Sequence, residues 1–434
     1  MAFVHCSSGE CTKSELDLFQ LAPTQTSIEK SFYVEVPPLT ALSDNAPLEF
    51  YITGNGEDYL DLNNTVIYLT CKITRHDGTK LALDDRVGLV NYPMASLFSQ
   101  VDITIGDRLI SQSNNCYPYR AIIESILNYS ESTLNTQYSA GLFVKDTAGQ
   151  HEVTVLNGAN LGFKNRAAYT AGSRKLELLG CIHADMFFQD KLMLNGVDIK
   201  IKLTCNREVF CLMSNAEDFK LSVLSAALFV KRVRVAPAVR LGHANALQVA
   251  NAKYPVDRVQ MKVFSLARGS RVCNQESLFL GQLPKIIVIG FVDNAAFSGD
   301  VTQNPFNFKH CDINFLDLYT DGEQIPTKLL QPDFANDNCV QEYFNLVETA
   351  GKRLKDKPLV VDHKEFARGY TLFAFNLSPD QECTGHYLLI KTGNLRAEIR
   401  FAQPLPTTVN MIVYAVFDNI VEINMRRQVL YDYS

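Results

Sequence analysis

One order of strand-like segments occurs twice in this chain, with the two copies roughly 200 residues apart. Residues 195–203 (NGVDIKIKL) have the pattern of residues 393–401 (GNLRAEIRF), in which a Gly/Asn turn precedes apolar and charged residues in alternation. Each segment is followed by a long alternating run that contains a similar tetrad, ALFV at 227–230 and AVFD at 415–418. A half-buried strand requires such alternation, because successive side chains point to opposite faces of a sheet.

An earlier pair of segments extends the match in the same order. Residues 101–105 lead into a Gly-Asp turn at 106–107, much as residues 315–319 lead into an Asp-Gly turn at 321–322. No single match is specific, since any half-buried strand that ends in a turn has this pattern. The shared order of three matches predicts two copies of one β-domain.

The length of 434 residues agrees with two domains. One hydrophobic core stops growing at roughly 250–300 residues, so two domains of about 200 residues are expected. A hydrophobic content of 47%, with 26 Phe and 18 Tyr, supplies enough apolar mass for two large β cores.

Short strands separated by turns fill both halves of the sequence. In the first half they are predicted at residues 32–36, 48–53, 66–73, 97–105, 176–188, 197–205 and 221–235. In the second half they are predicted at residues 256–266, 286–292, 313–319, 370–376, 386–391, 395–401 and 409–423. Turn sequences rich in Pro, Gly, Asn and Asp punctuate the strands, which is typical of an all-β sandwich and not of alternating βαβ units.

Each half also interrupts its strands with a polar insertion that carries a helix, at about 113–175 and about 327–368. In the first insertion, the apolar positions of residues 121–127 (AIIESIL) fall on one side of a helix. Strand density and size then predict two tandem eight-stranded antiparallel jelly-roll sandwiches. We predict an N-terminal arm at 1–30, a first jelly roll at 31–237, a linker at 238–250 and a second jelly roll at 251–434.

Two further helices are predicted in detail. The helix at 341–352 places Glu348 and Lys352 four residues apart, a spacing that favours an ion pair on one helix face. In the N-terminal arm, a short helix is predicted at 14–20, with Ser14 as its N-cap. An arm that docks on a neighbouring molecule and a flexible tail are both open interpretations of this segment.

The charge balance argues against a dedicated nucleic-acid-binding protein. The net charge is −6 and the pI is about 5.8, whereas affinity for phosphate comes mainly from clustered Lys and Arg. Lys231, Arg232, Arg234 and Arg240 form the best basic cluster, which we interpret as a solvated or interface-pairing face. We therefore predict no strong direct binding to nucleic acid.

Targeting signals are not evident in the sequence. The start MAFVHCSSGE lacks the basic and apolar regions of a secretory signal, and no apolar run approaches the ~18–20 residues of a membrane span. We predict a protein that is made and kept in a cytosol-like compartment, without a transmembrane segment. Eleven Cys, several of them in predicted strands (Cys71, Cys205, Cys211), are then expected to be reduced thiols.

Catalytic and metal-binding motifs are weak. There is no G-x-x-x-x-G-K-[ST], H-E-x-x-H or G-x-S-x-G sequence, and the Gly-rich residues 54–58 (GNGED) are interpreted as a turn. Three Cys/His groups are isolated: His5-Cys6 with Cys11, His310-Cys311, and Cys383 with His386. We predict no catalytic, cofactor-binding or metal-ligating residues and no cofactor. A Cys nucleophile beside a His stays open, because such pairs meet in space and not in sequence.

Several segments together carry a family resemblance. They are residues 13–19 (KSELDLF), 23–29 (PTQTSIE), 54–62 (GNGEDYLDL), 96–101 (SLFSQV), 118–121 (PYRA), 194–198 (LNGVD) and 413–419 (VYAVFDN). In their joint order, across nearly the full length, the chain resembles the major capsid proteins of Polinton/Maverick elements and their adintovirus relatives. These belong to the double jelly-roll lineage that includes adenovirus hexon.

The resemblance implies a structural protein with no reaction to perform and no catalytic residue to transfer. It implies homotrimers in which each subunit gives two upright sandwiches, so that three chains make a pseudo-hexagonal capsomer that tiles an icosahedral shell. The two insertions are then expected to project outward and to clasp neighbouring subunits. The expected partners are further copies of the chain, neighbouring capsomers and a penton (minor capsid) protein. The expected location is the virion, after assembly inside the host cell and without secretion.

Two other functions are compatible with a β-sandwich. A hydrolase would require a cleft that gathers two carboxylates or a Cys/His pair with shifted pKa values. A carbohydrate-binding protein would be expected to carry exposed aromatic residues on one face and usually a secretion signal. The lack of that signal and of any Trp argues against the second function.

Overall fold

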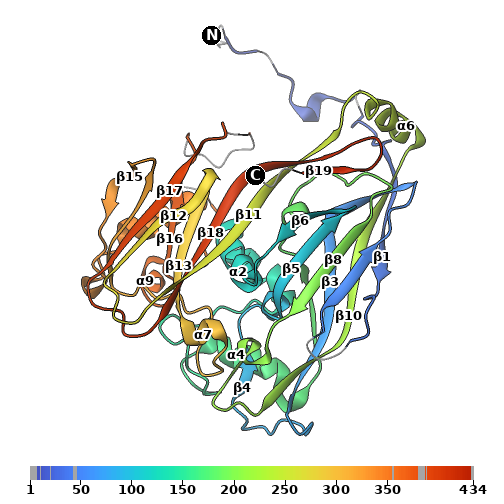
Figure 1. The fold of residues 1–434 in the computed structure, drawn as a ribbon. Helices are drawn as coiled ribbons and strands as arrows, with labels where there is room; N and C mark the ends of the chain where they lie inside the picture. Colours follow the sequence, from blue (N-terminus) through green and yellow to red (C-terminus); the bar gives the residue numbers. More distant parts are fainter. Residues whose placement is uncertain are drawn as a thin grey trace.

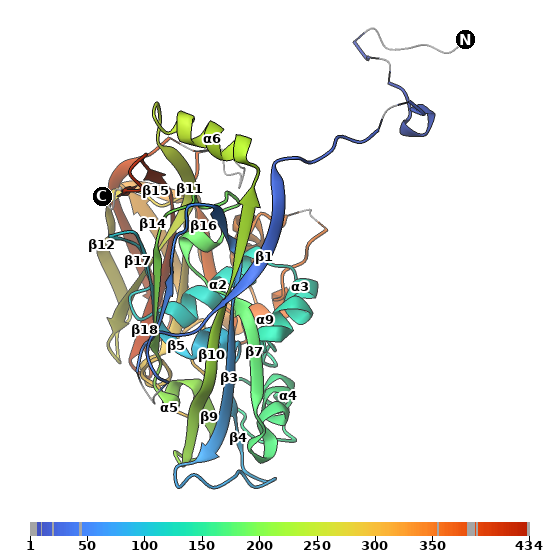
Figure 2. The ribbon, with the colours of Figure 1, turned by 90° about the vertical axis from the view of Figure 1, so that its right-hand side faces the viewer.

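Two β-sandwiches stand side by side in the computed structural model of the chain, with helices between them and around one end (Figure 1). The structure describes residues 7–431 except 10, 20, 43–45, 354–355, 380–386 and 388. Before the first strand, the N-terminal segment extends away from both sandwiches (Figure 2).

Eight strands of the first half form two four-stranded antiparallel sheets. One sheet has the order β1 (Ile28–Val36), β10 (Phe219–Val235), β3 (Asp58–Arg75) and β7 (Leu176–Cys181). The other has the order β2 (Leu48–Ile52), β8 (Ile199–Cys205), β5 (Phe98–Ile105) and β6 (Arg108–Gln112). Two short strands, β4 (Val87–Leu89) and β9 (Leu212–Ser214), pair separately.

Eight strands of the second half repeat this arrangement. One sheet has the order β11 (Ala252–Leu266), β18 (Val409–Ile423), β13 (Ile286–Asp293) and β16 (Leu372–Asn376). The other has the order β12 (Val272–Gln282), β17 (Thr392–Phe401), β14 (Ile313–Thr320) and β15 (Glu323–Leu330). A further short strand, β19 (Val429–Tyr431), pairs with β18.

The two halves share one topology. With β4, β9 and β19 set aside, each half pairs its first, eighth, third and sixth strands in one sheet and its second, seventh, fourth and fifth in the other. The segments matched in the sequence hold equivalent places, since residues 195–203 lead through β8 and residues 393–401 lie in β17, the seventh strand of each half. The predicted double jelly roll and its internal repeat are confirmed.

The helical insertions also occupy equivalent places, between the fifth and sixth strands of each half. The first contains α2 (Tyr117–Asn128), α3 (Glu131–Asn135), η2 (Gln137–Gly141), α4 (Leu161–Thr170) and η3 (Ala171–Ser173). The second contains η5 (Phe334–Asn336), α8 (Val340–Thr349) and α9 (His363–Phe366). Other short helices are η1 (Ser14–Leu16), α1 (Pro93–Ser96), η4 (Asp185–Phe187), α5 (Glu208–Cys211), α6 (Pro237–Ala246) and α7 (Asn294–Ser298).

Some predicted elements differ from the structure. The strand predicted at 176–188 ends at Cys181, because the chain then turns to bury Asp185 in η4. Strands β6, β12 and β15 were not predicted, since their sequences lack a long apolar alternation. In the segment predicted as a strand at 386–391, positions 386 and 388 lie outside the described residues and the other four are not in a strand.

The predicted N-terminal helix is also shorter than expected. It is a single 3₁₀ turn, Ser14–Leu16, in which Ser14 lies inside the turn and Lys13 holds the N-cap position without a capping side chain. Position 20, the end of the predicted helix, lies outside the described residues.

Apolar side chains fill the space between the two sheets of each sandwich. On β8, Ile199, Ile201 and Leu203 are buried, while Lys200 between them is exposed. Ile201 lies opposite Phe50 on β2 and opposite Ile103 on β5, so β8 has a hydrogen-bonded neighbour on each side. The alternation seen in the sequence therefore marks the core-facing side of each strand.

The outer face of the second half carries a buried carboxyl group. Asp317 on β14 is 0% exposed and lies directly opposite Glu398 on β17. Next to this pair, the guanidinium of Arg396 lies 4.5 Å from the centre of the Tyr319 ring. Burial raises the pKa of Asp317 to about 6, and the nearby charge of Glu398 acts in the same direction.

Replacement of this carboxyl group should stabilise the fold at neutral pH. The pKa of Asp317 rises from 3.8 to about 6 on folding, so its contribution to stability is lost as pH rises through that range. Asp317→Asn should raise the free energy of unfolding at pH 7 by about 1 kcal/mol and flatten its pH dependence between those values. Urea unfolding at several pH values measures both effects. The matched control Asp84→Asn, at an exposed position, should change neither, and an unchanged pH profile in the first variant would contradict the prediction.

Candidate functional site

Helix α2 lies between the two sandwiches (Figure 1) and carries Arg120, whose partner Asp185 binds the second half. Nη2 of Arg120 donates to Oδ1 of Asp185 at 2.7 Å. The same oxygen accepts from the backbone N–H of Val259, on β11 of the second half, at 3.3 Å. One buried carboxylate thus connects the first insertion to the second sandwich.

Arg120 is bound on three sides. Besides Asp185, its Nε donates to Oε1 of Glu124 at 2.8 Å and its Nη1 donates to Oγ of Ser111 at 3.2 Å. The arginine and both carboxylate side chains are at most 4% exposed. We call Arg120, Glu124 and Asp185 the junction.

The carboxylates of the junction respond differently to their surroundings. Burial raises the pKa of Asp185 above its ordinary value, although Arg120 acts against the shift. Burial opposes ionisation of Glu124 as well, but Arg120 and a hydrogen bond from His183 hold the pKa of Glu124 below its ordinary value.

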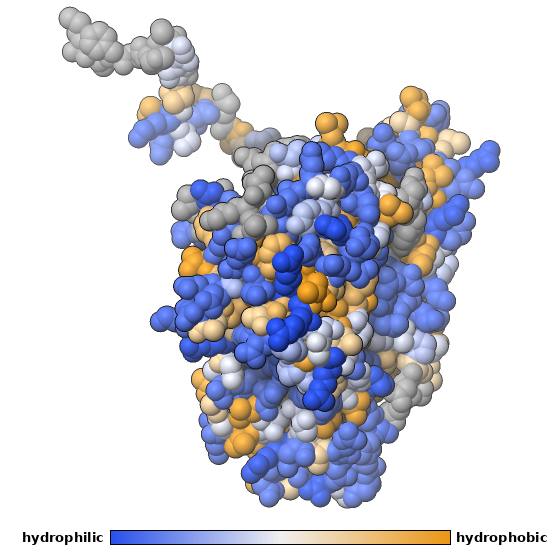
Figure 3. Space-filling view, turned by 60° about the vertical axis from the view of Figure 1, so that its left-hand side comes forward, coloured by the Kyte–Doolittle hydropathy of each residue, from blue (hydrophilic) through white to orange (hydrophobic). Residues whose placement is uncertain are grey.

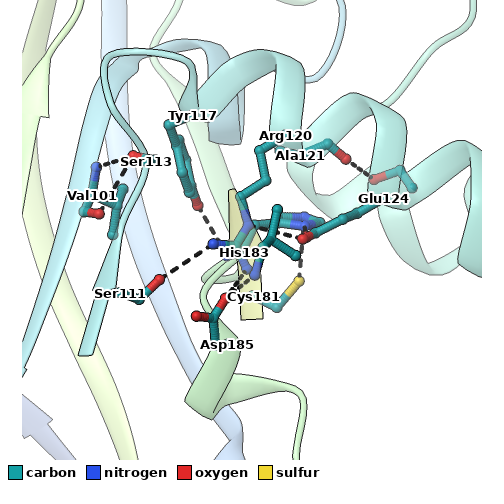
Figure 4. Close-up of polar contacts among 12 residues, drawn as sticks. Val101, Ser111, Ser113, Tyr117, Arg120, Ala121, Glu124, Cys181, His183 and Asp185 are labelled. Carbon is teal, nitrogen blue, oxygen red and sulfur yellow. Dashed lines mark hydrogen bonds and ion pairs between the residues drawn. The ribbon is translucent and has the colours of Figure 1, made fainter. Parts of the chain in front are cut away.

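A histidine and a cysteine extend the junction (Figure 4). Nδ1 of His183 lies 2.8 Å from Oε2 of Glu124, and Nε2 of the same ring lies 3.8 Å from Sγ of Cys181. The backbone N–H of His183 donates to the hydroxyl of Tyr117 at 3.1 Å. Cys181 ends β7 and is partly exposed, whereas His183 is buried.

A second buried polar cluster joins the first insertion to the second half. Nη2 of Arg166 on α4 pairs with Oδ1 of Asp146 at 2.7 Å. From the second half, Nδ2 of Asn304 donates to Oδ2 of Asp146 at 2.9 Å, and the hydroxyl of Tyr370 donates to its carbonyl at 2.6 Å. We call Asp146, Arg166, Asn304 and Tyr370 the clasp.

The two insertions contact each other through Lys352. Its ammonium donates to the carbonyl of Ile126 at 3.5 Å and also to the carbonyl of Tyr129, where α2 ends. The predicted pair of Lys352 with Glu348 is wrong, because Glu348 pairs with Arg353 at 3.0 Å and Lys352 is buried. Burial lowers the pKa of Lys352 to about 8.

A third tie comes from the turn between β18 and β19. Nε and Nη2 of Arg427 donate to the carbonyl and to Oδ1 of Asn195, each at 2.8 Å. Asn195 lies just before β8, so the C-terminal hairpin of the second half binds the first half.

A cavity of about 250 Å³ opens beside the junction between the two sandwiches. Its charged lining residues are Arg120, Glu124, Asp257, Lys285 and Asp418. Lys285 pairs with Asp257 at 2.6 Å and with Asp418 at 2.8 Å, and Glu124 is held by Arg120. Each carboxylate of this cavity therefore already has a cationic partner, which does not favour acid–base chemistry.

The predicted basic cluster is largely neutralised by neighbouring acids. Lys231 pairs with Asp61 at 3.0 Å, and Arg234 pairs with Glu57 and with Asp58, each at 2.9 Å. Arg232 donates to a backbone carbonyl at 2.9 Å and Arg240 lies on α6. The interpretation of this cluster as a solvated or interface-pairing face stays a prediction, because these contacts all lie within one chain.

Residues 54–58 form the turn that was predicted, between β2 and β3. The Gly54 N–H donates to Oδ1 of Asp198 at 2.8 Å, and Nδ2 of Asn55 donates to Asp58 at 2.8 Å. A Cβ at Gly54 would lie 2.5 Å from the backbone nitrogen of Val197, so only glycine fits here.

Most of the Cys and His residues singled out in the sequence remain apart. Cys71, Cys205 and Cys211 are free thiols whose pKa values are raised by burial. The ring of His310 stacks on Phe334 with 4.4 Å between centroids. Positions 5, 6, 383 and 386 lie outside the described residues, and within the described ranges no group of three or more His, Cys, Asp or Glu has a metal-binding arrangement.

Sequence reasoning missed the residues that the structure does gather. Cys181 and His183 were assigned to an ordinary strand, and Glu124 to the face of an amphipathic helix. Two signals pointed to them: a C-x-H sequence at the end of a strand, and an Arg120/Glu124 pair at i,i+4 within an otherwise apolar helix.

The chain has relatives both in sequence and in structure. No protein-family model matches the sequence. An uncharacterised protein of Caenorhabditis elegans is 26% identical over 428 residues, which cover 94% of this chain and 99% of that protein.

Three solved virus structures have the same fold. A chain of the Sputnik virophage structure matches with a TM-score of 0.70 and 14% identity, covering 100% of this chain and 95% of that one. The Faustovirus major capsid protein matches with a TM-score of 0.58 and 8% identity, over 94% and 92% of the two chains. The mavirus major capsid protein matches with a TM-score of 0.57 and 11% identity, over 100% and 97%. These full-length matches establish the double jelly-roll fold.

Removal of the junction cation should destabilise the protein strongly. Arg120→Met leaves the buried carboxylates of Glu124 and Asp185 without their guanidinium partner, which costs about 3–5 kcal/mol of unfolding free energy. Urea unfolding measures this loss. As a control, Arg75→Met breaks the ion pair of Arg75 with Asp85. The Arg75 side chain is 37% exposed, so this variant should lose much less stability than Arg120→Met. Equal stability of the two variants would show that the junction is not a structural support.

Proposed function

We propose that this chain is a major capsid protein, whose copies assemble into the shell of an icosahedral virion. The observation that carries the proposal is the strand order shared by both halves, matched over the full chain by the mavirus major capsid protein. The function is geometric: two sandwiches of equal topology stand side by side, and three such chains present six of them around one axis. A homotrimer of this kind is a pseudo-hexagonal capsomer.

The organisation of the chain follows from this proposal. Residues 1–30 serve as an arm, residues 31–237 and 251–434 as the two jelly rolls, and residues 238–250 as the linker. The insertions form the outward end of the capsomer. Within one subunit they already contact each other through Lys352, and in the capsomer they extend the same kind of contact to neighbouring subunits.

Within the capsid proteins, the seven sequence segments that carry the family resemblance support a Polinton/Maverick assignment. A relative in an animal, covering nearly the whole of both chains, agrees with an element carried in a host genome. The partners of the protein are then further capsomers and a penton protein. Its location is the virion, with assembly inside the host cell.

Exposed apolar side chains identify surfaces that association would cover. In the N-terminal segment, Leu16, Leu18, Phe19 and Leu21 are between 68% and 96% exposed. On β12, Leu280 is 80% exposed, and Figure 3 shows apolar patches across one mostly polar face. Exposed apolar surface of this extent is typical of protein–protein contact.

The hydrolase alternative gains little from the site. Cys181 and His183 do form a Cys/His pair, but neither lines the cavity beside the junction. A hydrolase needs a substrate cleft at its nucleophile. The carbohydrate-binding alternative has no specific observation in its favour.

The oligomeric state tests the proposal directly. Multi-angle light scattering of the purified chain at micromolar concentration should give three times 48.6 kDa. The expected cause is burial of the exposed apolar surfaces between copies. A monomer at this concentration would count decisively against a capsomer subunit.

The arm can be tested separately. Deletion of residues 1–26 keeps β1 and the hydrogen bond from the Ala236 N–H to the Ser27 carbonyl, which is 2.9 Å long. The variant should stay folded, with an unchanged urea midpoint, but should assemble less. Phe19→Ser with Leu21→Ser should reproduce the loss if the apolar side chains act, and the control Ser14→Ala should not. Normal assembly of the deletion variant would assign the segment as a tail.

A further inference from the structure

The cysteine at the end of β7 belongs to a chain of polar atoms that continues into the junction (Figure 4). Its Sγ lies 3.8 Å from Nε2 of His183, and Nδ1 of that ring lies 2.8 Å from Oε2 of Glu124. Glu124 is fixed in turn by Arg120 at 2.8 Å. The imidazole of His183 thus lies between the thiol of Cys181 and the carboxylate of Glu124.

The alignment determines which way a proton moves. The carboxylate of Glu124 accepts from Nδ1–H of His183, so Nε2 is the ring atom left to take the thiol proton. The Cys181 thiolate and the His183 imidazolium then stabilise each other, while Glu124 stabilises the imidazolium from the opposite side.

Tyrosine residues lie around Cys181 and His183. Tyr138 of η2 lies 3.7 Å from Sγ of Cys181, and the Tyr92 hydroxyl lies 3.1 Å from Nε2 of His183. Tyr117 accepts from the backbone of His183, and Tyr129 packs on Tyr138 with 4.7 Å between ring centroids. The charged groups near the pair are those of the junction, Arg120, Glu124 and Asp185. A thiolate here has hydroxyl donors within reach and a cation beside it.

We propose that Cys181 is a reactive thiolate, a covalent modification site for small, uncharged, soft electrophiles. The residue is partly exposed, and a small reagent needs the least space beside the surrounding tyrosines. This inference is independent of the capsid function.

The direction of the pKa shifts agrees with this geometry. Burial raises the pKa of the Cys181 thiol, but His183 and the hydroxyl donors overcome that effect and bring it below its ordinary value. Burial likewise lowers the pKa of His183, but Cys181 and Glu124 raise it to about 9.

Other cysteines of the chain serve as internal controls. Cys205 and Cys311 are also partly exposed, and burial raises the pKa of each. Cys339 lies 3.9 Å from Nε2 of His363, but it is buried and its pKa is raised to about 11. Comparison with these thiols shows how much of the reactivity of Cys181 comes from exposure and how much from the His183–Glu124 pair.

Alkylation with iodoacetamide tests the site, with each cysteine followed by peptide mass spectrometry. The thiolate sulfur attacks the methylene carbon, an S–C bond forms, the C–I bond breaks and iodide leaves, while the proton stays on His183. At pH 7, Cys181 should react at least about tenfold faster than Cys205 and Cys311. Its rate should rise less steeply between pH 6.5 and 8 than the rates of the control thiols, which should rise about tenfold per pH unit.

Two variants complete the experiment. His183→Gln should lower the rate at Cys181 by at least about tenfold at pH 7 and restore a steep pH dependence, with the control cysteines unchanged. Cys181→Ser should abolish the fast phase of labelling. If His183→Gln does not fold, the comparison of thiols in the unaltered protein decides. A rate at Cys181 no higher than those of Cys205 and Cys311, or a steep pH dependence of that rate, overturns the proposal.

Discussion

A single guanidinium group, buried where the two sandwiches meet, holds in place the carboxylate of Asp185 that binds the second half. Arg120 is bound to Glu124 and Asp185 at once, and Asp185 also accepts from the backbone of the second half. Charges removed from water are tolerated only when their partners are correctly placed. A small rotation of one sandwich against the other would break the hydrogen bond from Val259 to Asp185, so this contact favours one orientation. The capsid role proposed above requires such a fixed orientation.

Stability and geometry are supplied by different groups. The apolar residues between the sheets, such as Ile199 on β8 and Ile399 on β17, stabilise each sandwich from within. The junction, the clasp and the Arg427 contact are polar and lie between the halves. Hydrogen bonds and ion pairs are directional, whereas apolar packing is not. The apolar cores therefore stabilise each sandwich, and the polar contacts between the halves orient one sandwich against the other.

Local patterns in the sequence predicted the strands whose environment is local. Strands β8, β17 and β18 alternate because one face of each meets the core, and this is visible in any window of a few residues. Strand β12 was missed, since its middle is polar and its pairing shifts between Gln275 and Phe279. Lys352 was assigned to a surface pair because its true partner, the Ile126 carbonyl, is 226 residues away. The same limit hid the Cys181 site, in which Glu124 is 59 residues from His183.

The contact of Arg427 with Asn195 joins a residue near the end of the chain to the first jelly roll, so it forms late in translation. The hairpin that carries Arg427 is translated after all strands of both jelly rolls, yet it binds the first of them. Domains generally fold as they leave the ribosome, beginning with the N-terminal one. The contact between Arg427 and Asn195 can therefore form only after residue 427 has been translated, and a nascent chain arrested earlier lacks this tie between the two halves.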